Sequence, residues 1–276
     1  MKYQRFSLIV TIWFSMLWIA SAVFSQAADS CYQAFKERDG LWRIVENKVV
    51  NIYVVEGKDS TLVIDTGYGA GDLKAFIGTL TDLPLIVMNT HGHRDHVGGD
   101  NQFPRIYANP KDFDLLRSSI GTREGEEKVC PPLIPIQEGH VFDLGDRRLE
   151  VVEVPGHTAG SVCLFDTGNK ILFAGDHINQ VVWLFLKVCL PLEVYQESLK
   201  KVEGRLADFD VIMPGHNEPL DTAFLSELIQ SVANVLDGTC SPVPYNFSAI
   251  CEGALSCTYK RAQVAYNPDN LFVKKQ

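Results

Sequence analysis

Apolar positions along the chain fall into short runs, and polar turns that contain Gly, Asn or Asp separate them. Runs rich in Val, Ile and Leu predict strands. These strands are expected at 40–45, 49–55, 61–65, 84–88 and 209–213. Two longer segments, 141–154 and 161–174, each contain a central turn and therefore predict hairpins. Apolar residues at helical spacing predict helices over 72–80, 192–206 and 221–236.

This alternation of strands and helices, with no internal repeat shorter than half the chain, predicts an α/β (α+β) fold in which outer helices cover two mixed β-sheets. Pro110 predicts the start of a further short helix. The segment 118–135 has no clear period and contains several Gly and Pro residues, so it is expected to be a long loop. Such a loop is either a lid over a binding site or a simple surface insertion.

The first residues have a charge and apolar pattern of their own. Lys2 and Arg5 precede an almost wholly apolar stretch over 6–20, and small residues follow at spacings that suit cleavage. We interpret residues 1–27 as a secretory signal peptide, which makes 28–276 the mature domain of a secreted or periplasmic protein. The alternative is a membrane anchor that is not cleaved, because the apolar stretch approaches the ~18 residues that suggest a membrane helix.

The composition is that of an acidic globular chain. With 276 residues, 46% of them hydrophobic, the chain can build one large core or two small ones, and its single set of candidate site residues favours one domain. The formal net charge of −9 disfavours nucleic acid and anionic membranes as partners. We therefore expect a small-molecule substrate, and no stable membrane association once the leader is removed. The sequence leaves the oligomeric state open.

Export would allow the seven cysteines to form disulfide bonds, although their odd number leaves at least one unpaired within the chain. Cys240, Cys251 and Cys257 lie in a C-terminal tail, about 238–276. They could tie this tail back through bonds to each other or to Cys31. No pair of cysteines has the C-x-x-C spacing that is typical of a structural zinc site, and the connectivity does not follow from the spacing.

A polar stretch directly after the strand at 84–88 carries the main candidate chemistry. It contains His91, His93, Asp95 and His96, bounded by glycines. In extended chain, side chains two residues apart project the same way, so His91 and His93 can bind one cation. Asp95 and His96 are displaced from them and can serve a second cation. Imidazole and carboxylate together suit zinc first, with iron or manganese as alternatives.

Three more candidate ligands follow downstream: His157, Asp176 and His216. Each comes after an apolar, strand-like segment, and each is directly preceded by glycine, which lets the backbone turn sharply near an ion. The order His-x-His-x-Asp-His, then single His, Asp and His, resembles the metallo-β-lactamase superfamily of dinuclear metal hydrolases. The resemblance covers the chain from about Leu41 to about Leu220.

The resemblance implies a four-layer αββα sandwich and two zinc ions per chain. On the family pattern one zinc would be held by His91, His93 and His157, and the other by Asp95, His96 and His216, with Asp176 bridging the two. A hydroxide shared by the two zinc ions would attack the substrate, and Asp95 or Asp176 would pass a proton to the leaving group. Asp65, at the end of a predicted strand, is expected to support a ligand.

The substrate class is narrowed by two positions. Histidine at 93 differs from the glutamate of the oxygen-reducing di-iron relatives, and Asp176 resembles the bridging ligand of the glyoxalase II, lactonase and phosphodiesterase branches. We therefore expect an exported hydrolase of ester-type bonds, with lactones or related esters favoured. A β-lactamase and a glyoxalase II-like thioester hydrolase are the alternatives within the family. A non-catalytic metal-binding or interaction protein is the alternative of another class.

Some residues near the motif allow two interpretations. The apolar run 181–186 is either core or the wall of a pocket, because it follows Asp176 so closely. His177 could contact substrate or only pack, and the same holds for the hydroxyl of Tyr195 on its predicted helix.

Overall fold

The computed structural model describes residues 31–120, 129–246 and 248–274. The expected leader, 1–27, and much of the loop expected at 118–135 lie outside the described residues. The helix expected after Pro110 forms, beginning as a 3₁₀ turn, and ends just before that gap.

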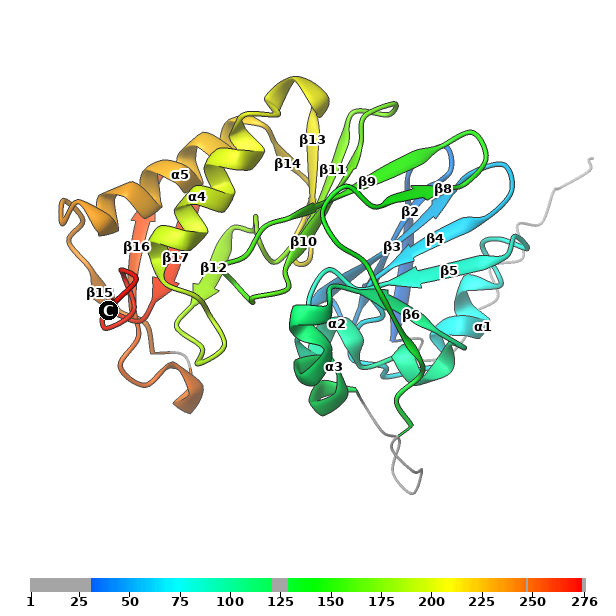
Figure 1. Ribbon diagram of the computed structural model, residues 1–276, viewed down its shortest axis with the longest axis horizontal. Coiled ribbons are helices and arrows are strands. Elements are labelled where there is room, and N and C mark those ends of the chain that lie inside the picture. The colour runs from blue at the N-terminus through cyan, green and yellow to red at the C-terminus, as the bar shows by residue number, and fades with distance from the viewer. Residues whose placement is uncertain (1–30, 121–128, 247, 275–276) are drawn as a thin grey trace, which may run out of the picture. The chain divides into compact units, whose positions relative to one another are not determined.

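The first half of the chain builds a seven-stranded sheet in sequence order (Figure 1). Its first four strands pair antiparallel and the later ones pair parallel, so the sheet is mixed. The strands are β1 (Tyr32–Arg38), β2 (Leu41–Glu46), β3 (Val50–Glu56), β4 (Thr61–Ile64), β5 (Leu85–Met88), β6 (Ile106–Ala108) and β7 (Leu133–Pro135).

The second half builds a six-stranded mixed sheet in the order β14-β13-β11-β10-β9-β8. Both predicted hairpins form, β8–β9 and β10–β11, and β13 then pairs parallel with β11. The strands are β8 (Val141–Asp143), β9 (Arg148–Glu153), β10 (Val162–Asp166), β11 (Ile171–Gly175), β13 (Val211–Pro214) and β14 (Leu220–Asp221).

Alternate side chains of each strand point to opposite faces of its sheet, and the inner faces of the two sheets pack against each other. On β3, Tyr53 and Val55 point into a core shared with residues of the second sheet such as Leu164 and Phe173. Ile52 and Val54 of the same strand point the other way, into a core that includes the helix α1 (Leu73–Ile77). The period of two thus gives each sheet an inner and an outer apolar face.

Helices cover the outer faces. α4 (Leu192–Glu203) and α5 (Ala223–Leu236) bury residues at helical spacing, among them Tyr195 and Leu228, in one core with the outer face of the second sheet. The four-layer αββα prediction is therefore confirmed. The shorter helices are α2 (Arg94–Val97) and α3 (Phe113–Ser119), with 3₁₀ turns at Asp100–Gln102, Pro110–Asp112, Leu206–Asp208 and Ala249–Cys251. Within the described residues, no helix has the length and apolar character required to cross a membrane.

A third sheet has no counterpart in the prediction, which placed a tail at this end of the chain. It has four strands in the order β12-β17-β16-β15, and α5 packs against it (Figure 1). Its strands are β12 (Val181–Leu184), β15 (Val243–Pro244), β16 (Leu255–Tyr259) and β17 (Ala262–Tyr266). A disulfide bond between Cys240 and Cys257 joins the chain after α5 to β16.

Candidate metal centre

Strand direction brings the downstream site residues to one edge of the second sheet. β9 and β11 both pair antiparallel with β10, and β13 pairs parallel with β11, so β9, β11 and β13 end at the same edge. His157, Asp176 and His216 follow those three ends. The polar stretch after β5 of the other sheet meets them there, and all seven predicted site residues lie in two neighbouring groups.

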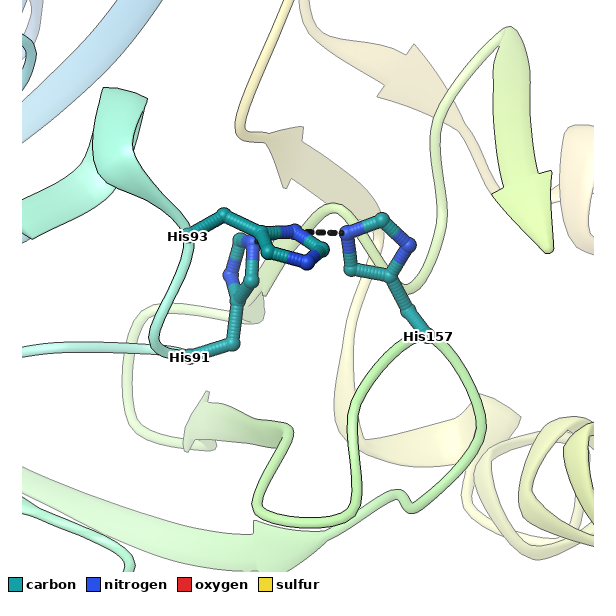
Figure 2. A group of neighbouring side chains, drawn as sticks. All are labelled: His91, His93 and His157. Carbon is teal, nitrogen blue, oxygen red and sulfur yellow. Dashed lines mark hydrogen bonds between the residues drawn. The ribbon is translucent and has the colours of Figure 1, made fainter. Parts of the chain in front are cut away.

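The first group consists of His91, His93 and His157. His93 Nδ1 lies 3.1 Å from His91 Nε2 and 2.9 Å from His157 Nε2, so three ring nitrogens face one another. Figure 2 shows the rings converging from two separate segments of backbone. Nitrogen ligands at about 2.0–2.1 Å from a tetrahedral zinc lie roughly 3.3 Å apart. The group therefore fits a single cation with little movement.

The second group consists of Asp95, His96, Asp176 and His216. His216 Nε2 lies 3.2 Å from Asp95 Oδ2 and 3.4 Å from Asp176 Oδ2, and His96 Nε2 lies 3.4 Å from Asp176 Oδ1. His96 Nε2 and Asp176 Oδ1 are buried, and neither has a hydrogen-bond partner among the described residues. Buried polar atoms without partners are rare. These two atoms are therefore suited to bind a cation.

Asp176 lies between the two groups. Besides its contacts with His96 and His216, its Oδ2 is 3.6 Å from His157 Nε2 of the first group. One carboxylate thus reaches ligand atoms of both groups, which is the arrangement that a bridging ligand requires.

Hydrogen bonds fix the orientation of three of the histidines. His157 Nδ1 donates to the backbone oxygen of Trp183 at 2.8 Å, and His216 Nδ1 donates to that of Val49 at 2.8 Å, because a carbonyl can only accept. His96 Nδ1 lies 2.8 Å from Asp65 Oδ2. Each ring therefore turns Nε2 toward its group, where this nitrogen can bind a cation once it carries no proton.

Asp65 is held for this task at some conformational cost. It has a φ of 64°, in the left-handed region, and it accepts a hydrogen bond from the backbone N–H of Thr90 at 2.7 Å. The Thr90 hydroxyl donates to the same carboxylate at 2.8 Å. The contact with His96 agrees with the supporting role that the sequence favoured for Asp65.

A second buried carboxylate, Asp112, was missed in the sequence. It accepts hydrogen bonds from the backbone N–H of Gly92 at 2.9 Å, from the Thr158 hydroxyl at 2.6 Å and from the backbone N–H of Gly160 at 2.7 Å. Gly92 lies between His91 and His93, and Thr158 follows His157. Asp112 therefore joins the two segments that carry the first group. No local pattern distinguishes this aspartate from a turn residue.

Two glycines make the close approach of the segments feasible. A Cβ on Gly215 would lie 2.4 Å from Asp176 Oδ1, and one on Gly175 would lie 2.6 Å from Thr90 Oγ1. Gly175 also has a positive φ of 50°. Side chains at these positions would push the second group apart, which explains the glycines that precede Asp176 and His216.

The two groups differ in their protonation. Burial, reinforced by the neighbouring imidazoles, lowers the pKa of His93 to about 3 and lowers those of His91 and His157 as well. For His216, burial acts in the same direction, but Asp176 and Asp95 outweigh it and raise the pKa to about 10. The first group thus offers neutral imidazoles at pH 7, whereas a cation in the second would displace protons.

A cavity of about 600 Å³ opens over both groups. Its floor is polar, and one side is apolar. The residues that line it are Val49, Tyr68, His93, Arg94, Asp95, His157, Asp176, Asn179, Val181, Trp183, Leu186, His216, Asn217, Tyr245 and Ile250. The run 181–186 therefore contributes to a pocket wall. Tyr195 does not, because its hydroxyl is buried and donates to the backbone oxygen of His177. The ring of His177 is buried beside it, at a centroid distance of 4.8 Å.

This geometry agrees with comparisons to known proteins. A family model described as the metallo-beta-lactamase superfamily matches residues 46–216, which is more than half of the chain. The chain belongs to the metallo-beta-lactamase superfamily. The family and the two groups of ligand-type side chains indicate an enzyme of the hydrolase class that binds metal.

Similar proteins include one enzyme named as a thioesterase and one named as a hydrolase. Acyl-coenzyme A thioesterase MBLAC2 from Homo sapiens is 31% identical over 203 residues, which cover 60% of this chain and 72% of the relative. A hydroxyacylglutathione hydrolase from Mesorhizobium japonicum is 33% identical over 141 residues, 51% of each chain. A solved metallo-beta-lactamase from Pontibacter korlensis matches 74% of this chain and 99% of its own, with a TM-score of 0.62 and 23% identity, and shows the fold alone.

Proposed function

We propose that this protein is an exported, zinc-dependent hydrolase of thioesters and related carboxylic esters. The observation that carries the proposal is the position of Asp176, within 3.6 Å of ligand atoms of both groups, at the floor of an open cavity. A site built only for stability would have no need of a substrate-sized cavity directly above its ligands. This favours catalysis over the non-catalytic alternative.

The residues that would hold two zinc ions are those of the two groups: His91, His93 and His157 for one, Asp95, His96 and His216 for the other, and Asp176 for both. When bound, such ions supply Lewis acidity, and they make water nucleophilic at neutral pH. No serine or cysteine nucleophile is needed.

The protein's own contribution is orientation and proton transfer. Hydrogen bonds to Asp65, Trp183 and Val49 hold the histidines with Nε2 toward the cavity floor. Asp95 lines the cavity beside Asp176 and His216, and we assign its carboxylate the transfer of a proton from water to the leaving group.

Thioesters become the leading substrates because two similar proteins carry thioesterase or hydroxyacylglutathione hydrolase names. Lactones, which the sequence favoured, are the second candidate. The partly apolar cavity of about 600 Å³ has room for a cyclic ester as well as for an open one.

Export rests on the leader pattern of residues 1–27 and is supported by the Cys240–Cys257 disulfide. A disulfide of this kind persists in oxidising compartments, whereas cytosolic thiols stay reduced. Expression of the full chain with detection of the processed N-terminus outside the cytoplasm tests this part. An unprocessed chain held in the membrane would support the anchor instead.

The experiment that tests the activity uses the mature protein from Ala28 onward. An acyl thioester, an aryl ester, an acyl lactone, a β-lactam and a phosphodiester are each offered before and after chelation. We expect chelator-sensitive turnover that is fastest with the thioester. Fastest turnover of the lactone would select the second candidate. No turnover of any ester, with two metal ions still bound, would contradict the proposal and support the non-catalytic alternative.

A further inference from the structure

The cavity above the two groups has an apolar side that the metal chemistry does not use. Seven of its lining residues are hydrophobic or aromatic, and five of them come from the two segments 181–186 and 245–250: Val181, Trp183, Leu186, Tyr245 and Ile250. We refer to these five as the apolar wall. The side chains on the floor are imidazoles and carboxylates, so the cavity presents two chemically distinct surfaces to one ligand.

The apolar wall is built from segments distant in sequence. Trp183 lies on β12, whereas Tyr245 and Ile250 lie between β15 and β16, beyond the region 46–216 that matches the family model. The Trp183 indole N–H donates to the Tyr245 hydroxyl at 3.0 Å, which joins the two segments. Tyr245 and Ile250 therefore extend the wall with residues from outside the region that matches the family model.

The wall has a core of its own behind it. Trp183, Leu186 and Tyr245 pack on a cluster of buried side chains that includes Phe185 and Cys251. Phe185 lies 5.1 Å from the Trp183 ring and 5.8 Å from the Tyr245 ring, centroid to centroid. The Cys240–Cys257 disulfide fixes the start of this segment to β16. The wall is thus a supported surface and not a loose loop tip.

Trp183 also fixes the wall relative to the reaction centre. Its backbone oxygen accepts the hydrogen bond from His157 Nδ1 at 2.8 Å, while its side chain faces the cavity as part of the wall. One residue therefore orients a ligand histidine and carries the apolar surface. A substrate whose carbonyl lies at the floor must place an adjoining group close to Trp183.

The exposure of the apolar wall indicates the chemical nature of the substrate group that adjoins the carbonyl. Ile250 keeps 59% of its surface exposed, among the largest values for hydrophobic residues in the described part of the chain. Apolar surface gathered at the mouth of a cavity, next to a few convergent polar groups, is typical of a ligand site. The complementary ligand has a polar carbonyl end and an apolar chain.

We propose that the apolar wall binds the acyl chain of the substrate and sets its chain-length preference, so that the substrates are thioesters or esters of medium or longer unbranched fatty acids. This inference rests on the proposed function, because it concerns the same site. Leu186 and Ile250 are specificity-determining residues, whereas Trp183 also positions His157.

The test is a series of thioesters with one thiol and straight acyl chains from acetyl to decanoyl. Full burial of one methylene corresponds to about a fourfold gain in kcat/KM. We expect kcat/KM of the wild type to rise roughly two- to fourfold per methylene until the wall is covered. Leu186→Ala and Ile250→Ala should each lower the decanoyl-to-acetyl ratio of kcat/KM at least about fivefold.

Val243→Ala is the matched control. Val243 lies on β15 of the same sheet and is 56% exposed, but it does not line the cavity. This variant should keep the wild-type ratio. Equal kcat/KM for all chain lengths in the wild type, or the same change of ratio in Val243→Ala and Leu186→Ala, would overturn the assignment.

A binding measurement separates this inference from the proposed function. If the zinc-loaded wild type turns over no thioester, ester or lactone, the proposed function fails, and calorimetry with butyrate and decanoate then decides on the wall. Decanoate binding at least about tenfold more tightly than butyrate, with the difference lost in Leu186→Ala, would support an acyl-chain site. Equal affinities would reject it.

Discussion

The Thr158 hydroxyl donates a hydrogen bond of 2.6 Å to the buried carboxylate of Asp112, and this contact connects two parts of the first histidine group. The same carboxylate oxygen accepts the backbone N–H of Gly92, between His91 and His93. Only 2% of Asp112 is exposed. The distance between the histidines of the first group therefore depends on Asp112, which is not itself one of the candidate metal ligands.

Replacement of Asp112 should weaken metal binding at the first group. In Asp112→Ala the two segments lose their common acceptor, so we expect metal affinity at His91, His93 and His157 to fall roughly 10- to 100-fold. Competition with a zinc-binding dye measures this directly, and one zinc per chain should be lost before the other.

The matched control is Asp166→Asn. Asp166 is equally buried and pairs with Arg147 at 2.6 Å, but it lies at the end of β10, the edge opposite the site. This variant should lose stability and keep both zinc affinities. Equal loss of both zinc ions in Asp112→Ala, or the same loss of zinc affinity in Asp166→Asn, would reduce Asp112 to a general structural role.

The second group should be essential for turnover. His96→Ala and Asp176→Ala each remove a side chain that meets the other ligands within 3.6 Å, so we expect kcat/KM to fall at least ~100-fold. His140→Ala provides the control, since His140 packs edge-to-face with Phe142 and does not line the cavity. Near-normal turnover in either of the first two variants would contradict a two-metal centre.

The sequence predicted the position of the site better than it predicted the residues that hold the ligands in place. The ligands follow strands that a local apolar pattern marks, as with His91 after β5 and His216 after β13. Asp112 could not be found in this way, because its supporting role depends on hydrogen bonds from Gly92 and Thr158, which contact it only in the folded chain. Glu46 lies between the strands expected at 40–45 and 49–55, yet it is buried and accepts the backbone N–H of Ala70 at 2.6 Å.

The third sheet was missed for the same reason. Val181 pairs with Gln263, so the neighbour of β12 lies far along the chain, where local periodicity does not reveal it. β1 was missed because it is an edge strand with several exposed charged residues, which weaken the apolar alternation. Local periodicity indicates that a strand exists, but long-range packing decides its partner.

The Cys240–Cys257 disulfide should stabilise the third sheet. It closes a loop with a sequence separation of 17, for which the expected contribution is about 3 kcal/mol. Denaturant unfolding of a Cys240→Ser, Cys257→Ala double variant should show a loss of that size. Reductant should lower the stability of the wild type and leave the variant unchanged. Equal sensitivity of both proteins to reductant would rule out this pairing.

Asp100 should make stability depend on pH. Burial raises the pKa of its carboxyl to about 8, so in the folded protein it keeps a proton that the unfolded chain has released above pH 3.8. Its contribution is fully present below pH 3.8 and is lost as pH rises towards 8, by up to about 1.4 kcal/mol per pH unit.

Asp100→Asn removes this dependence, because an amide does not ionise and can still accept the hydrogen bonds from Thr66 and Asn89. Unfolding of metal-free protein at pH 5, 6, 7 and 8 should show the variant gaining stability relative to the wild type at each step. A constant difference across these pH values would show that Asp100 is already ionised in the fold.

The central claim, a two-zinc centre that hydrolyses thioesters, is tested most directly by zinc titration of metal-free mature protein with thioester turnover measured at each addition. We predict that turnover is absent without metal, that zinc binds to two equivalents per chain, and that activity reaches its maximum as the second equivalent binds. Full turnover in the absence of metal, or two bound zinc ions without any turnover, would contradict the account.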